Sequence, residues 1–103
     1  MNEQRSPPEL EPAVFVIDGP IERSRIPELC ARLRAICEER PGRAVVCDVR
    51  SLDEPDAVDV DALARLQLTA VRSEGTIRLR AGCAELFELL DLVGLREALP
   101  AEE

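Results

Sequence analysis

The feature that most constrains the fold of this chain is a repeated alternation between short apolar runs and longer amphipathic segments. Residues 13–17 and 44–49 are largely continuous apolar runs, which are typical of strands covered on both faces. Residues 76–80 alternate in polarity, which is typical of a half-exposed strand near a sheet edge. Because a helical pattern follows each run, the sequence predicts an α/β fold with a small, mostly parallel sheet.

The first helical pattern begins near Ser24, which we expect to cap the helix, and it accommodates Pro27 in its first turn. Its apolar stripe recurs at helical spacing: Ile26, Leu29, Cys30, Leu33, Ile36 and Cys37. The second pattern leads from the acidic stretch after residue 50 toward Gly75. The third covers residues 84–93 and is closed by Gly94.

Length and charge restrict the organisation and the partners. The 103 residues are enough for one domain, which we place at 13–100 between a Pro-rich polar leader (1–12) and a short tail (101–103). The net charge of −8 argues against nucleic acid and against docking on anionic membranes. Residues 1–12 carry no signal-peptide pattern, and no apolar stretch approaches the roughly 20 residues that span a bilayer, so we expect a cytoplasmic protein.

Catalytic chemistry has little support in this composition. The chain contains no His, which is the commonest general base and metal ligand, and it has no Gly-rich phosphate loop. We therefore expect no enzymatic activity, no cofactor and no metal site. Arginine is the sole basic residue type, which, with the abundance of Ala, Leu and Val, indicates a GC-rich bacterial coding sequence.

The four cysteines include no Cys-x-x-Cys pair: Cys30, Cys37, Cys47 and Cys83. We expect reduced thiols that pack as small apolar side chains, with a redox switch as the alternative. A direct bond between Cys30 and Cys37 would break the helix, because seven helical residues span about 10.5 Å and a disulfide needs Cα atoms within about 7 Å.

Five carboxylates crowd into nine residues after the second apolar run: Asp53, Glu54, Asp56, Asp59 and Asp61. The first interpretation is a helix start, with Asp56 as the N-cap and acids in the first turn offsetting the helix dipole. The second is an acidic surface that faces a partner. The third is a Ca²⁺ or Mg²⁺ site, although the glycine that an EF-hand loop needs for its turn is absent.

Several stretches form an ordered set of short motifs. Residues 16–22 (VIDGPIE) contain a Gly-x-x-Glu turn, and residues 45–52 (VVCDVRSL) contain a strand followed by Asp-Val-Arg-Ser. Residues 56–63 (DAVDVDAL) follow, and residues 74–79 and 89–95 come last. In order and spacing they resemble the STAS domain (sulfate transporter and anti-sigma factor antagonist) over about residues 13–99.

The resemblance implies a site at the start of the second helix. Phosphorylated members of the family carry a serine after the motif aspartate, and an anti-sigma kinase phosphorylates it. Here that position is Ala57, which has no hydroxyl, and Val58 and Asp59 replace the family's next Ser and Gly. Glu22 stands where the family usually has the aspartate of its Gly-x-x-Asp turn. The sequence therefore predicts a non-enzymatic, partner-binding module that is not switched by phosphorylation at residue 57.

The expected partner-binding surface combines the start of the second helix with two neighbouring turns: Asp53, Glu54, Asp56, Ala57, Val58, Asp59, Asp61, Gly19, Glu22 and Arg23. The partner implied is an anti-sigma factor kinase-like protein, and the alternative is a transport ATPase for which this chain is an accessory subunit. A homodimer is also open. Nucleotide binding is a further alternative. Arg23, Arg25 and Arg50 would then have to attract the phosphates against the negative net charge.

Overall fold

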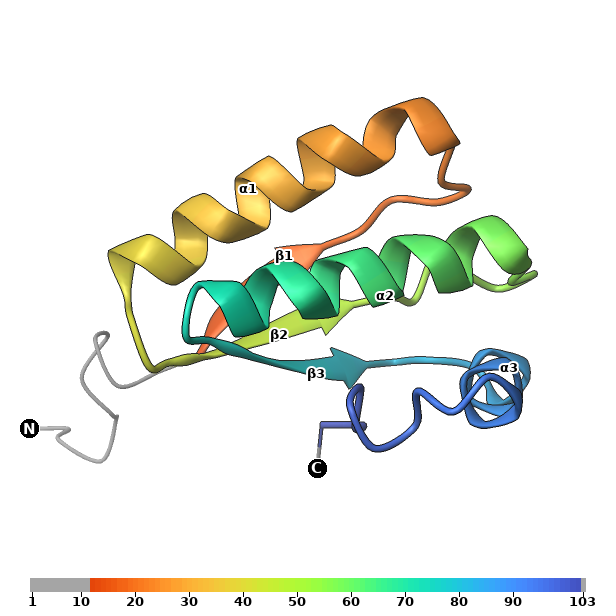
Figure 1. Cartoon of the computed structure of the whole chain (residues 1–103). Coiled ribbons are helices and arrows are strands. Elements are labelled where there is room, and N and C mark those ends of the chain that lie inside the picture. Colours follow the sequence, from red (N-terminus) through yellow and green to blue (C-terminus); the bar gives the residue numbers. More distant parts are fainter. Residues whose placement is uncertain (1–11, 103) are drawn as a thin grey trace, which may run out of the picture.

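A computed structural model describes residues 12–102, which form a three-stranded parallel sheet and three α-helices (Figure 1). The strands lie in chain order: β1 (Ala13–Val16), β2 (Ala44–Asp48) and β3 (Thr76–Arg80). The helices alternate with them: α1 (Ile26–Glu39), α2 (Ala57–Arg72) and α3 (Ala84–Leu92), with a 3-10 turn, η2 (Arg23–Arg25), before α1. The predicted α/β class with a small parallel sheet is confirmed. The predicted leader, apart from Pro12, lies outside the described residues.

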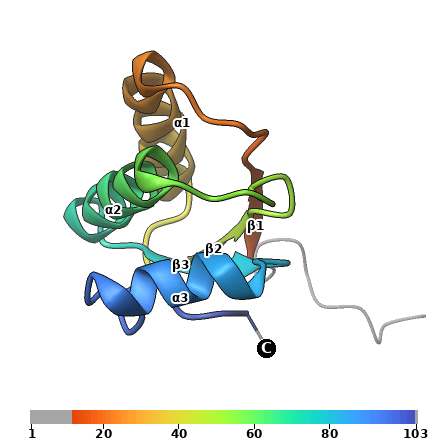
Figure 2. The same cartoon turned by 90° about the vertical axis from the view of Figure 1, so that its right-hand side faces the viewer.

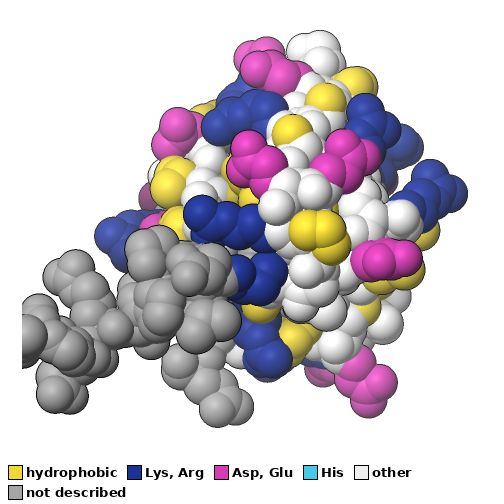
Figure 3. All heavy atoms as spheres, turned by 90° about the vertical axis from the view of Figure 1, so that its left-hand side faces the viewer, with side chains coloured by type: hydrophobic (Ala, Val, Ile, Leu, Met, Phe, Trp, Pro, Cys, Tyr) yellow, Lys and Arg dark blue, Asp and Glu magenta, His cyan; other side chains and the backbone are white. Residues whose placement is uncertain are grey.

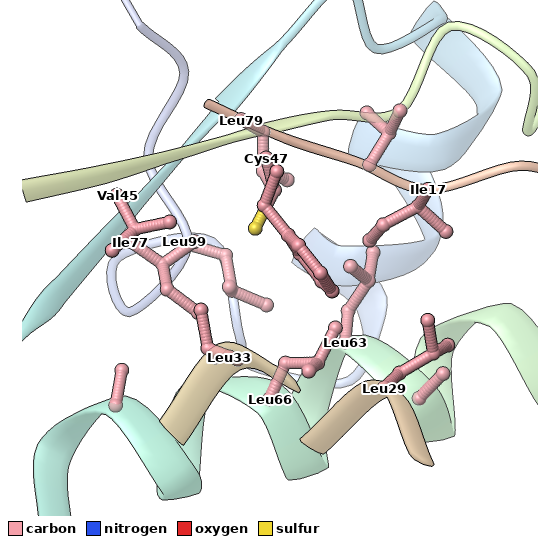
Figure 4. Packing of buried hydrophobic residues seen from close by; sticks show 14 of the residues in the cluster. Ile17, Leu29, Leu33, Val45, Cys47, Leu63, Leu66, Ile77, Leu79 and Leu99 are labelled. Atoms are coloured by element: carbon pink, nitrogen blue, oxygen red, sulfur yellow. The ribbon is translucent and has the colours of Figure 1, made fainter. Parts of the chain in front are cut away.

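Helices α1 and α2 lie on the same side of the sheet, as two perpendicular views show (Figures 1 and 2). The core fills the space between these helices and the strands. Leu29 and Leu33 of α1 and Leu63 of α2 point toward the strands (Figure 4). All of these leucines are buried, so removal of apolar surface from water between the two layers is the main stabilising term.

The prediction that the first strand is covered on both faces is wrong. Phe15 and Ile17 are buried, but Val14 and Val16 are 47% and 51% exposed. The reason is that β1 lies at the edge of the described sheet and that α1 and α2 cover one face only. The coverage predicted for β2 holds better, because this strand is central and its middle residues, Val45–Cys47, are buried.

The apolar stripe of α1 is confirmed, but its predicted cap is wrong. Helix α1 begins at Ile26, and Ser24 lies in η2. The Arg25 N–H donates to the Glu22 carbonyl at 2.9 Å, so a 3-10 turn precedes the helix where a serine cap was expected. Arg25 holds the N-cap position without a side-chain cap bond, and Pro27 lies in the first turn as predicted.

The end of the chain covers the outer edge of β3. The Leu79 N–H donates to the Pro100 carbonyl, and the Glu102 N–H donates to the Leu79 carbonyl, both at 2.8 Å. Ala101 thereby forms a parallel bridge with Leu79. Arg80 donates to both carboxylate oxygens of Glu102, at 2.6 and 2.8 Å. The half-exposed edge strand predicted at residues 76–80 is confirmed, and its free edge is protected by backbone pairing and a two-pronged ion pair.

The orientation of α2 predicts that shortening a leucine side chain lowers the free energy of unfolding by different amounts on its two faces. Leu63 is fully buried, so Leu63→Ala is expected to lower the free energy of unfolding by about 2–5 kcal/mol. Leu68 on the same helix is 48% exposed, so Leu68→Ala is expected to lower it by about 1 kcal/mol or less. Urea unfolding followed by circular dichroism measures both values, and equal losses would contradict this orientation of α2.

Candidate functional site

The carboxyl ends of the strands place the predicted partner-binding residues on adjoining segments. Gly19, Glu22 and Arg23 lie between β1 and α1, and residues 53–61 lie between β2 and the second turn of α2. We call residues 19–23 and 53–61 the carboxyl-edge surface. Parallel sheets usually bind ligands at this edge where the strand order reverses. The order β1-β2-β3 has no reversal among the described strands, so surface contact is favoured here over a deep ligand crevice.

Helix α2 begins with a reciprocal pair of aspartates. The Asp59 N–H donates to Asp56 Oδ1 at 3.1 Å, and the Asp56 N–H donates to Asp59 Oδ2 at 3.1 Å. This capping box confirms Asp56 as the N-cap and satisfies two backbone donors at the helix start. A cap of this kind contributes about 1 kcal/mol to stability.

Asp59 also joins α2 to the turn after β1. It is 4% exposed, and the backbone N–H of Ile21 lies near enough to its carboxylate to affect its pKa. Burial raises the pKa of Asp59, and the negative charge of Asp56 adds to the rise. The N–H groups of Asp56 and Ile21 act in the opposite direction because they stabilise the ionised carboxylate. Asp59 is therefore a buried link between two segments of the carboxyl-edge surface and does not face a partner.

A glycine lets the turn after β1 approach the loop after β2. A Cβ atom on Gly19 would lie 2.7 Å from Leu52 Cδ2 and 2.9 Å from the Ser51 carbonyl oxygen. Such distances are too short for any side chain at this position without a shift. The contact brings Gly19 beside the loop that carries Asp53 and Glu54. A shallow pocket of about 260 Å³ lies at this junction, and Pro20 and Asp53 are among its lining residues.

Asp61 points away from that junction. Its carboxylate accepts Arg23 Nη1 at 3.0 Å and Arg65 Nε at 3.1 Å. These residues line a groove of about 420 Å³ between α1 and α2. Arg65 was not predicted, although its i, i+4 spacing from Asp61 is a usable signal. Since both pairs are solvent-exposed, each contributes about 1 kcal/mol or less to stability.

The accessible part of the carboxyl-edge surface is smaller than the predicted set. Six of the predicted residues are exposed: Glu22, Arg23, Asp53, Glu54, Asp56 and Ala57. Asp53 and Glu54 form no ion pair within residues 12–102. Val58 is half-buried and packs against the core. The acidic cluster therefore divides into structural, ion-paired and exposed members.

The third interpretation of the acidic stretch, a Ca²⁺ or Mg²⁺ site, has no matching arrangement of side chains in the described residues. Within residues 12–102, no group of three or more Cys, Asp or Glu side chains is placed to hold a metal ion. Three carboxylates of the cluster have separate partners instead. Asp56 and Asp59 cap the start of α2, and Asp61 pairs with two arginines.

The arginines considered for a nucleotide are engaged separately. Arg25 Nη1 donates to the Asp18 carbonyl oxygen at 3.2 Å, and Arg50 Nη2 lies 3.7 Å from an Asp48 carboxylate oxygen. Arg23 points to the groove between α1 and α2. Three guanidinium groups with three different neighbours do not form a phosphate cradle.

The cysteines are free thiols, and the packing interpretation is confirmed. Cys37 and Cys47 are buried, and Cys30 and Cys83 are partly buried against the core. Burial raises the pKa of Cys47 to about 12, with a smaller contribution from Cys37. A thiol with so high a pKa stays protonated at neutral pH and is unreactive.

Two comparisons with known proteins were negative. No protein-family model matches the chain, and a search of curated proteins finds no match either.

Among residues 12–102, none of the helices has the length and apolar character needed to cross a bilayer.

Asp59 gives the stability a pH dependence of defined sign. Its folded-state pKa is above the ordinary 3.8, so between these values the folded state binds more protons than the unfolded state. The free energy of unfolding therefore falls as pH rises through that window. In Asp59→Asn this contribution is absent, so the stability of the variant relative to wild type is expected to rise with pH. Denaturant unfolding from below pH 3.8 to neutral pH measures the difference, and a constant difference would contradict the assignment.

The close contact at Gly19 predicts a destabilising substitution. Gly19→Ala is expected to lower the free energy of unfolding by about 1–3 kcal/mol, because Leu52 and the Ser51 carbonyl must move. In a Leu52→Val background the same change is expected to cost less, since the clashing methyl group is gone. A double-mutant cycle by denaturant unfolding measures this coupling, and strictly additive losses would show that the two residues do not touch.

Proposed function

We propose that this protein is a non-enzymatic STAS-type module that binds another protein through the carboxyl-edge surface. It resembles an anti-sigma factor antagonist that is not switched by phosphorylation at residue 57. The observation that supports this most strongly is the fixed geometry of the surface. Asp59 ties the turn after β1 to the start of α2 and leaves Ala57 exposed at the first position of the helix.

The fixed geometry favours recognition of a partner. A surface that is already ordered loses little conformational entropy on binding, so more of the contact energy appears as affinity. Asp53 and Glu54 are exposed beside Ala57 and supply negative charge there. Their two carboxylates replace part of the charge of a phosphate group, which is about −1.5 to −2 at neutral pH. The module would then present a constant acidic surface instead of a switched one.

We propose a cytoplasmic setting for this interaction. The support is that all four cysteines are free and that Cys30 and Cys83 keep some exposure. Free thiols persist in reducing compartments, whereas oxidising compartments favour disulfides.

The proposal predicts that a bulky cation at residue 57 blocks the partner. Ala57→Arg leaves the capping box of Asp56 and Asp59 in place but occupies the centre of the surface. Wild type and variant, checked for folding by circular dichroism, would be used to capture partners from an extract of the source cells. We expect the partner to be reduced at least tenfold with Ala57→Arg and unchanged with the matched control Ala35→Arg on the exposed side of α1.

The identity of the captured protein separates the two partner classes. A kinase-like anti-sigma factor lost with Ala57→Arg would support the proposal. A transport ATPase would replace it with the accessory-subunit function. Equal recovery with wild type and with Ala57→Arg would place binding on another face and overturn the proposed surface.

A further inference from the structure

A groove of about 620 Å³ lies beside the carboxyl-edge surface, between α3 and the loop before α2. Six residues line it: Glu54, Pro55, Glu85, Glu88, Leu89 and Leu92. Leu92 is 81% exposed, which is the largest value for an apolar side chain of its size in the described residues. The adjacent Val93 is also more than half exposed. So much exposed apolar surface next to a groove is typical of a protein-binding site.

The lining of the groove along α3 forms one face of that helix. Glu85, Glu88, Leu89 and Leu92 stand at positions i, i+3, i+4 and i+7, which project from the same side. They extend over about 10.5 Å of helix axis, which matches two turns of a second helix laid against them.

The rim of the groove carries uncompensated negative charge. Glu54, Glu85 and Glu88 form no ion pair within residues 12–102, and no arginine lines the groove. Other parts of the surface differ. At the end of the molecule remote from α3, arginine side chains are interspersed with acidic ones (Figure 3). Asp61 likewise has two arginine neighbours.

We propose that this groove binds a basic amphipathic helix of the partner protein. Apolar side chains of that helix would pack on Leu89 and Leu92, and arginine or lysine residues beside them would pair with Glu54, Glu85 and Glu88. An apolar helix without cations would desolvate carboxylates and leave them unpaired, which is costly. A second copy of this chain carries a net charge of −8, so electrostatic repulsion disfavours it as the occupant.

This inference rests on the proposed function, since Glu54 belongs to both the groove and the carboxyl-edge surface. It adds the chemical character of the partner's contact segment. A partner seated on Ala57 would extend its basic helix along α3. Because the groove and the carboxyl-edge surface are continuous at Glu54, one partner can contact both.

The test uses a synthetic helical peptide with leucines on one face and arginines flanking them. Titrated into the ¹⁵N-labelled full chain, it is expected to shift the amide signals of residues 54 and 85–92. Affinity is expected to fall at least tenfold in Glu85→Gln/Glu88→Gln and in Leu92→Ser. The matched double change Glu38→Gln/Glu39→Gln, on exposed acids at the end of α1, is expected to leave it unchanged.

Three results would overturn the proposal. The first is equal weakening by the two double variants, which would mean non-specific charge attraction. The second is undiminished binding of a control peptide whose leucines are replaced by serine. The third is chemical shift changes confined to surfaces other than α3. Failure of the groove is distinguishable from failure of the proposed function. A wild-type chain that does not bind the peptide, but whose captured partner is still lost with Ala57→Arg, would contradict the groove alone.

Discussion

The three strands lie side by side in chain order, and both connecting helices, α1 and α2, cover the same face of the sheet. This topology concentrates the buried leucines between helices and strands and leaves Val14 and Val16 exposed on the other face. It also brings the turns after β1 and β2 to one edge, next to the start of α2. The candidate site is thus a direct consequence of strand order.

Asp59 fixes the turn after β1 against the start of α2. Its buried carboxylate accepts the backbone N–H of Asp56 and lies near the backbone N–H of Ile21, which belongs to the turn after β1. Its raised pKa shows that burial still opposes ionisation, so the link has an electrostatic cost. Because Asp59 is used in this way, only exposed acids such as Asp53 and Glu54 are available to a partner.

Periodicity alone predicted the parallel sheet, the apolar stripe of α1 and the half-exposed strand β3, because these depend on local patterns. It did not predict that β1 is covered on one face, since a run of apolar residues does not determine on which side later helices pack. The link from Asp59 to Ile21 depends on a tertiary contact and has no sequence signature. The groove was not predicted, because the apolar pattern over residues 84–93 does not show which of its side chains stay exposed. Leu89 lines the groove, and Val93 is about half exposed.

The central claim is that Asp59 holds the turn after β1 against α2. Residue-level amide hydrogen exchange of wild type and Asp59→Ala tests it most directly. We expect the Ile21 amide and the first turn of α2 to lose protection in the variant, while the amides of β2 and β3 keep theirs. Wild-type protection at Ile21 and in that first turn would contradict the claim, because the surface would then be fixed without this carboxylate.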